Sequence, residues 1–231
     1  MLSAIAPPKV GLETQIGSYA ALGDSFTAGR GLDGRRWTDE LASRLADRNP
    51  NFTHRNFARP GATSLDVVDT QLTRALEYSP DLVTIVCGVN DVLGAQRPDF
   101  IGYAERLSET ILRLRENAVR TFVVTATCPN HAWRLSLAKR AHEQLVNGVE
   151  LLNEATRSVA RRLAVPYVDF GSARAAPDSE PGARMALSRD PRCACVAMVD
   201  AFATLVEDAP RGRGEVVLSG HVGHALATSR T

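Results

Sequence analysis

The stretch Ala20–Thr27, with the sequence AALGDSFT, governs how the rest of the chain is interpreted. Its apolar residues end at Gly23 and Asp24, a serine follows, and a glycine-rich segment comes next. This order predicts a β-strand whose closing turn presents the Ser25 hydroxyl at the carboxyl edge of a sheet, where ligand chemistry collects in open α/β folds. Two interpretations of Ser25 stay open: a nucleophile, or a residue that caps a helix or closes a turn.

Apolar patterning along the chain predicts strands that alternate with helices. Strands are expected at residues 19–22, 54–58, 82–87, 121–126 and 166–170. Helices are expected at 36–48, from an N-cap at Ser64 through Leu76, at 100–117, and at 136–163 with or without a break at Gly148. The alternation predicts an α/β fold with a parallel sheet that helices cover on both faces.

Composition and charge limit the classes of protein to which the chain can belong. The 231 residues are 44% hydrophobic with a formal net charge of +1, which fits one α/β domain with a sizeable core. The balanced charge gives no indication of nucleic acid or an anionic membrane surface as a partner. Residues 1–17 hold no long apolar run, so we expect neither a secretory signal nor a membrane span, and a cytoplasmic protein.

The four cysteines do not form a pattern that predicts a metal site. Cys87 and Cys128 lie in or just after apolar strands, where a cysteine is usually a small buried hydrophobe. Cys193 and Cys195 form a C-x-C pair without a second pair at the spacing of a zinc site. We therefore expect no metal and no other cofactor.

Three of the predicted strands end in loops that carry polar or small residues. These loops hold Ser25, Gly61 and Asn90, and in a parallel sheet they open at the same edge. A serine oxygen, a glycine N–H and an asparagine amide that converge there would supply a nucleophile and donors for an oxyanion, as acyl transfer from a small ester requires. The alternative is that Gly61 and Asn90 are ordinary turn residues.

The block at 23–25, Gly61 and the Gly88-x-Asn90-Asp91 block together resemble the SGNH (GDSL-type) hydrolases, in order and spacing, over roughly residues 18–170. The resemblance implies a flavodoxin-like three-layer α/β/α sandwich with a five-stranded parallel sheet and the activity of a lipase-like serine esterase. It also implies that Ser25 is the nucleophile. The oxyanion hole would then consist of the N–H groups of Ser25 and Gly61 and the side chain of Asn90.

The general base is where the sequence departs from the family, which places a histidine near the C-terminus in an Asp-x-x-His-Pro-like block. Leu218 stands three positions before His221, and His221 stands three positions before His224, so neither histidine has the expected acid. Three alternatives follow: His221 serves alone with Ser25, His131 replaces it, or the base is absent.

The resemblance continues to Arg192 and stops abruptly at Cys193. We therefore expect an SGNH-hydrolase-like domain over residues 1–192 and an atypical tail over 193–231. A shifted reading frame in the source gene would produce such a change.

Two other functions compete with ester hydrolysis. Gly29–Gly34 fits the dinucleotide pattern G-x-G-x-x-G, but the first strand ends well before it and no acidic residue closes the second strand. A rim loop over the pocket is the better interpretation of those glycines. The second rival is a non-catalytic carbohydrate- or lipid-binding module on the same scaffold, which the missing Asp-x-x-His block favours. No pattern in the sequence specifies the oligomeric state.

Overall fold

A parallel six-stranded sheet forms the centre of the computed structural model, which describes residues 16–29, 36–93, 95–125, 139–169 and 215–217. The strand order is β2-β1-β3-β4-β5-β6. The strands are β1 (Ser18–Gly23), β2 (Thr53–Asn56), β3 (Leu82–Val86), β4 (Arg120–Val124), β5 (Tyr167–Asp169) and β6 (Glu215–Val217). All five predicted strands are present, and β6, which pairs with β5, is an addition that the sequence did not predict.

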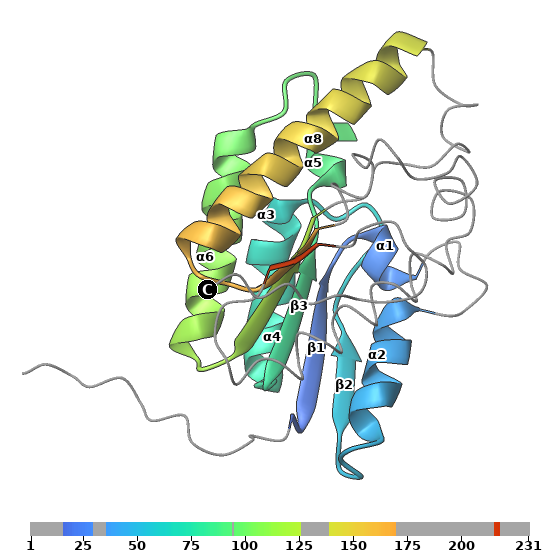
Figure 1. Ribbon diagram of the computed structural model, residues 1–231, viewed down its shortest axis with the longest axis vertical. Helices are drawn as coiled ribbons and strands as arrows, with labels where there is room; N and C mark the ends of the chain where they lie inside the picture. Colours follow the sequence, from blue (N-terminus) through green and yellow to red (C-terminus); the bar gives the residue numbers. More distant parts are fainter. Residues whose placement is uncertain (1–15, 30–35, 94, 126–138, 170–214, 218–231) are drawn as a thin grey trace, which may run out of the picture.

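Helices connect the strands, and each predicted helix is present (Figure 1). They are α1 (Ser25–Ala28), α2 (Trp37–Ala46), α3 (Ser64–Asp66), the π-helical segment η1 (Val67–Gln71), α4 (Leu72–Tyr78), α5 (Val89–Leu93), α6 (Phe100–Glu116) and α8 (Lys139–Arg162). The short helices α1 and α5, which directly follow β1 and β3, were not predicted.

The N-cap of α3 is Thr63, so the prediction of Ser64 in that role was wrong. Thr63 and Asp66 form a capping box, in which the Thr63 hydroxyl accepts from Asp66 N and the Asp66 carboxylate accepts from Thr63 N at 2.8 Å. A capping box needs an acidic or amide residue three positions after the hydroxyl residue. Thr63 has Asp66 at that position, whereas Ser64 has Val67. Ser64 is therefore the first helical residue, and its hydroxyl is available to another partner.

Helix α8 continues through Gly148 without a break. A Cβ at that position would lie 2.5 Å from Val92 Cγ1, so the missing side chain lets α8 approach α5 closely. The glycine is thus a packing residue, and the alternative of a helix break there was wrong. The predicted start of this helix, residues 136–138, lies outside the described residues.

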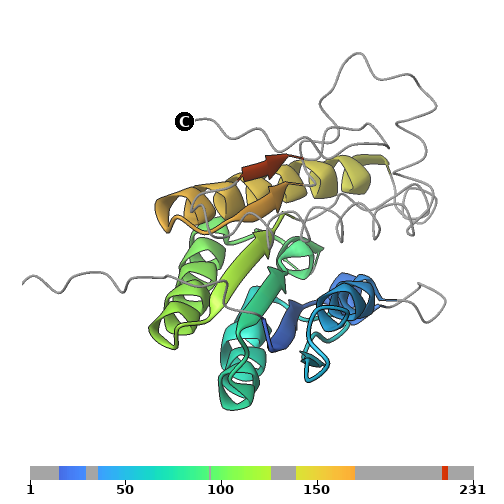
Figure 2. The same cartoon turned by 60° about the horizontal axis from the view of Figure 1, so that its bottom comes forward.

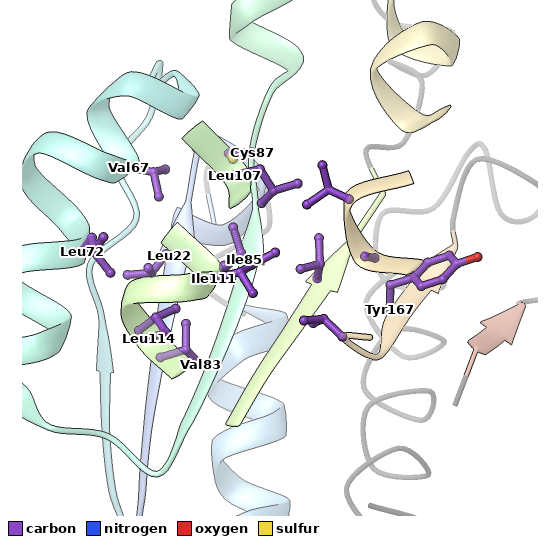
Figure 3. Close-up of a cluster of buried hydrophobic side chains, with 14 of the residues drawn as sticks. Leu22, Val67, Leu72, Val83, Ile85, Cys87, Leu107, Ile111, Leu114 and Tyr167 are labelled. Carbon is purple, nitrogen blue, oxygen red and sulfur yellow. The ribbon is translucent and has the colours of Figure 1, made fainter. Parts of the chain in front are cut away.

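The strands alternate their side chains between two cores, which makes the fold a three-layer α/β/α sandwich (Figure 2). One core holds Leu22 and Ile85 against η1, α4, α6 and α8 (Figure 3). The other holds Tyr19 and Val86 against Trp37 and other residues of α2. The predicted α/β class with a parallel sheet covered on both faces is confirmed.

Strand register brings the turns after β1, β2 and β3 to one edge of the sheet. Gly23, the last residue of β1, pairs with Val86, the last residue of β3. Phe57, which follows β2, donates its N–H to Ala21 O of β1. In Figure 1 this carboxyl edge is the end of the sheet where α1, α3 and α5 lie.

Candidate active site at the carboxyl edge

The turn after β1 places Ser25 at the carboxyl edge. Gly23 has a φ of 149°, and a Cβ there would lie 2.1 Å from Val86 O, so only glycine lets β1 close this tightly against β3. Asp24 then donates its N–H to Val86 O at 3.2 Å. Ser25 follows as the first residue of α1 and is half-buried.

The cap of α1 is Asp24 and not Ser25. Asp24 Oδ1 accepts from Phe26 N at 2.9 Å, and the carboxyl is 4% exposed. Burial raises the pKa of Asp24 to about 6; the Phe26 hydrogen bond opposes the rise and the nearby charge of Asp91 adds to it. Because Asp24 satisfies the helix terminus, the Ser25 hydroxyl is not needed as a cap.

The loop after β2 carries Gly61 and is attached to the end of β1. Arg59 donates its N–H to Gly23 O at 3.1 Å, and Ala62 donates to Arg59 O at 3.1 Å. Gly61 has a φ of 81° and is exposed, and no atom of the other described residues beyond its chain neighbours lies within 4 Å of where a Cβ would stand. The space beside its backbone is therefore open to a bound molecule.

Asn90, on α5 just after β3, contacts the same loop directly. Its Nδ2 donates to Ala62 O at 2.8 Å. This hydrogen bond joins two turns that are 28 residues apart in the sequence. An amide nitrogen carries two hydrogens, so Asn90 keeps a second N–H for another acceptor.

Asp91 reinforces this junction with its carboxylate. Its Oδ2 accepts from Ser64 N at 2.9 Å, and its Oδ1 accepts from Ser64 Oγ at 2.5 Å. Arg106 of α6 donates from Nε to Ser64 Oγ at 2.8 Å and places Nη2 3.5 Å from Asp91 Oδ1. Asp91 thus fixes α5 to the start of α3, which follows the Gly61 loop.

Sequence reasoning missed Gln71, the last residue of η1, which is 1% exposed. Its Oε1 accepts from Gly23 N at 2.8 Å and its Nε2 donates to Gly23 O at 2.9 Å. The signal that could have revealed it is periodicity, because Gln71 lies four residues after Val67 and three after Val68, on the apolar face of the helix. A polar residue at such a position needs a buried hydrogen-bond partner.

The histidines named as candidate bases, His221, His224 and His131, lie outside the described residues. The described imidazole, His54 of β2, stacks on Tyr19 with ring centroids 5.0 Å apart, and burial lowers its pKa. It pairs with Tyr19 in the sheet, four residues before Gly23, or about 13 Å along the strand. His54 is accordingly remote from Ser25.

Several other predictions also concern residues outside the described ranges. These are Cys128, Cys193 and Cys195, the later glycines of Gly29–Gly34, and the domain boundary at 192/193. Cys87 is described and is buried, and burial raises the pKa of its thiol well above the ordinary value, so it is an unreactive core residue. Within the described part of the chain, no helix has the length and apolar character to cross a membrane.

Comparisons with known proteins agree with this architecture. Residues 21–191 match the model of the GDSL-like lipase/acylhydrolase family. No curated protein sequence matches the chain.

Solved structures with the same fold include LAE5, an alpha/beta hydrolase enzyme from the metagenome of Lake Arreo, Spain. It has 20% sequence identity and a TM-score of 0.60, and the match covers 86% of this chain and 98% of LAE5. The acetyl xylan esterase AlAXEase has 16% identity and a TM-score of 0.61, with 82% and 99% coverage. A catalytic mutant of Axe2, an acetylxylan esterase from Geobacillus stearothermophilus, has 20% identity and a TM-score of 0.55, with 84% and 95% coverage. The family match spans most of the chain, which therefore belongs to the GDSL-like lipase/acylhydrolase family of carboxylic-ester hydrolases.

Proposed function

We propose that the protein is a serine esterase that cleaves a small ester through an acyl-enzyme, with Ser25 as the nucleophile. The observation that carries the proposal is the junction of three turns at one sheet edge. The Gly61 loop is bonded to the end of β1 through Arg59 N and Gly23 O, and to Asn90 through Ala62 O. These bonds bring the Gly61 loop and Asn90 to the edge of the sheet where β1 ends, two residues before Ser25.

The oxyanion hole in this proposal consists of three donors. The N–H of Ser25 belongs to the first turn of α1, whose leading N–H groups have no acceptor within the helix. The N–H of Gly61 lies in an exposed loop, and no other part of the described chain fills the space beside that residue. The second N–H of Asn90 is oriented by the bond that the first makes to Ala62 O.

The reaction follows from these positions. Ser25 Oγ attacks the carbonyl carbon, its proton passes to a base, and the carbonyl oxygen becomes an anion that the three donors stabilise. The base returns the proton to the departing alcohol, which leaves the acyl group on Ser25. Water, activated by the same base, then releases the carboxylic acid and restores the hydroxyl.

We assign the general base to His221, with His131 as the alternative. A serine hydroxyl without a base is a weak nucleophile at neutral pH, so the proposal requires one of these imidazoles. Replacing each in turn identifies it: the essential histidine, changed to alanine, abolishes turnover, and the other change has little effect.

The test of the function is hydrolysis of p-nitrophenyl acetate by the purified protein and by Ser25→Ala. An acetyl ester is a suitable probe because acetylxylan esterases are among the proteins of similar fold. The proposal predicts serine-dependent release of p-nitrophenol, with a loss of about a thousandfold or more in kcat on removal of the nucleophile. Equal rates for the two proteins contradict it.

Equal rates would favour the alternative of an impaired SGNH-like module that binds a carbohydrate or lipid and lacks a competent His-Asp pair. That outcome is checked by the thermal shift that xylan oligosaccharides or fatty acids produce in the wild-type protein, since a ligand that binds only the folded state raises the Tm.

A further inference from the structure

The Gly23 peptide group is bonded by a side chain rather than by a strand. β2 pairs with β1 only from Ser18 to Ala21, so Gly23 projects beyond the end of its neighbour. Gln71 bonds both atoms of Gly23 on that side, accepting from Gly23 N at 2.8 Å and donating to Gly23 O at 2.9 Å. Only this orientation of the Gln71 amide places its oxygen beside the Gly23 N–H and its nitrogen beside the Gly23 carbonyl oxygen, so that each donor meets an acceptor.

The same carbonyl oxygen also accepts from the neighbouring loop. Arg59 N donates to Gly23 O at 3.1 Å. Gly23 lies two residues before Ser25, and Arg59 lies two residues before Gly61. Gln71 therefore holds an acceptor, Gly23 O, at which the nucleophile turn and the Gly61 loop meet.

Gln71 is presented by an irregular helical turn. Leu72 N donates to Val67 O, five residues back, which defines the π-helical segment η1 between α3 and α4. Gln71 lies on the buried face of this segment together with Val67 and Val68. A π-turn inside an α-helix is frequently associated with a functional site, because it inserts a residue that regular packing would not place there.

We infer that Gln71 is a positioning residue of the active site: its amide fixes the Ser25 turn and the Gly61 loop relative to each other through Gly23. This inference rests on the proposed roles of Ser25 and Gly61. Gln71 lies at the base of these turns and acts on substrate only through them. Because a displacement of about 1 Å can cost about a hundredfold in rate, loosening this junction lowers kcat.

The chain offers a matched control at the other end of β1. Asp81 Oδ2 accepts from Gly17 N at 2.8 Å and Ser18 N at 2.9 Å, so it also attaches β1 to a distant segment, but at the amino edge. Asp81→Ala removes a comparable side-chain clamp on the same strand without touching the carboxyl edge.

The experiment compares Gln71→Met, which removes both hydrogen bonds at similar volume, with Asp81→Ala. Steady-state hydrolysis of p-nitrophenyl acetate is measured at a temperature where urea unfolding shows each protein to be folded. Gln71→Met is expected to lower kcat roughly 10- to 100-fold with KM within about twofold, because donors to the oxyanion act in the transition state. Asp81→Ala is expected to keep wild-type kcat and KM.

A second measurement is independent of activity. Amide hydrogen exchange in Gln71→Met is expected to accelerate at Gly23 N and Arg59 N, whereas in Asp81→Ala these amides keep wild-type exchange. If Gln71→Met does not fold, Gln71→Glu replaces it, since a carboxylate still accepts from Gly23 N but cannot donate to Gly23 O.

Wild-type kcat in the Gln71 variant, or unchanged exchange at Arg59, overturns the inference. A loss of kcat that Asp81→Ala shares to the same extent overturns it as well. If wild-type hydrolysis does not depend on Ser25, the proposed function fails, and the exchange measurement still decides whether Gln71 joins the two turns.

Discussion

The two ends of strand β1 are held by different kinds of side chain. At the amino end, the exposed carboxylate of Asp81 accepts from Gly17 N, Ser18 N and Ser18 Oγ through a single oxygen. At the carboxyl end, the buried amide of Gln71 both accepts from and donates to Gly23. Each side chain attaches the strand to a segment that is distant in the sequence. Asp81 is 63 or 64 residues from the donors that it binds, and Gln71 is 48 residues from Gly23.

The difference shows where the protein needs precision. Water can replace much of what an exposed clamp supplies, so its removal costs little. A buried clamp has no such substitute, and its loss leaves the Gly23 N–H unsatisfied and Gly23 O with only the bond from Arg59 N. We therefore expect the clamp at the amino end to contribute to the stability of the fold, and the clamp at the carboxyl end to fix the relative positions of the turns around Ser25.

Among changes that keep the nucleophile, the largest expected effect is that of Asn90→Ala. We expect kcat/KM for p-nitrophenyl acetate to fall about a hundredfold or more, equivalent to about 3 kcal/mol, because one oxyanion donor is removed. Steady-state kinetics on the purified variant measure this loss.

Asn49→Ala is the matched control at the amino edge, since Asn49 Nδ2 also donates to a backbone carbonyl, Ile16 O, at 3.3 Å. We expect it to keep wild-type kinetics. Equal losses in the two variants would mean that amide-to-carbonyl bonds anywhere around the sheet matter for activity, and the contrast between the two ends would be lost.

An effect of at most the same size, on stability rather than rate, is expected for Asp24→Asn. The pKa of Asp24 rises from 3.8 to about 6 on folding, so its contribution to stability is fully present below about pH 4 and is lost as the pH rises through about 6. Above that pH the buried charge costs up to about 3 kcal/mol. Asparagine keeps the acceptor for Phe26 N without the charge, so the variant is expected to be the more stable protein at about pH 8 and to match wild type at about pH 4.

Urea unfolding of both proteins at those two pH values measures the difference. Asp81→Asn is the control and is expected to change stability in the opposite sense, because a carboxylate that accepts several N–H groups is replaced by a weaker acceptor. A gain for Asp24→Asn that does not depend on pH, or a loss at about pH 8, contradicts the account.

The smallest effect is expected for Ser18→Ala. This change removes the bond that Ser18 Oγ donates to Asp81 Oδ2 at 3.1 Å and the bond that it accepts from Asp81 N at 3.0 Å. It leaves the donors Gly17 N and Ser18 N to Asp81 in place. We expect a loss of roughly 0.5–1 kcal/mol in the free energy of unfolding, measured in urea, and unchanged kcat. A change in kcat would show that the amino end also influences the reaction.

Much of this fold could be predicted from periodicity. The apolar run at 82–87 predicted β3, a strand buried on both faces, and the alternation of strands with helices predicted the parallel sheet. Strand β6 was missed because its three residues are too short for a period to be recognised. The turns that hold Ser25, Gly61 and Asn90 were located correctly because strand ends in a parallel sheet share an edge.

What periodicity could not show is how these turns are joined. The bonds from Gln71 to Gly23 and from Asn90 to Ala62 span 48 and 28 residues, and they depend on side-chain directions that a residue pattern does not contain. The π-turn at Val67–Gln71 was missed for the same reason, since its residues fit the regular helical stripe of the neighbouring segments.

The central claim is that the junction of these turns surrounds an activated serine. The most direct measurement is labelling with a fluorophosphonate, followed by peptide mass spectrometry of the wild-type protein and of Ser25→Ala. The account predicts one adduct per chain, on the Ser25 hydroxyl, and none in the variant. An unlabelled wild-type protein, or an adduct that persists in Ser25→Ala, would contradict it.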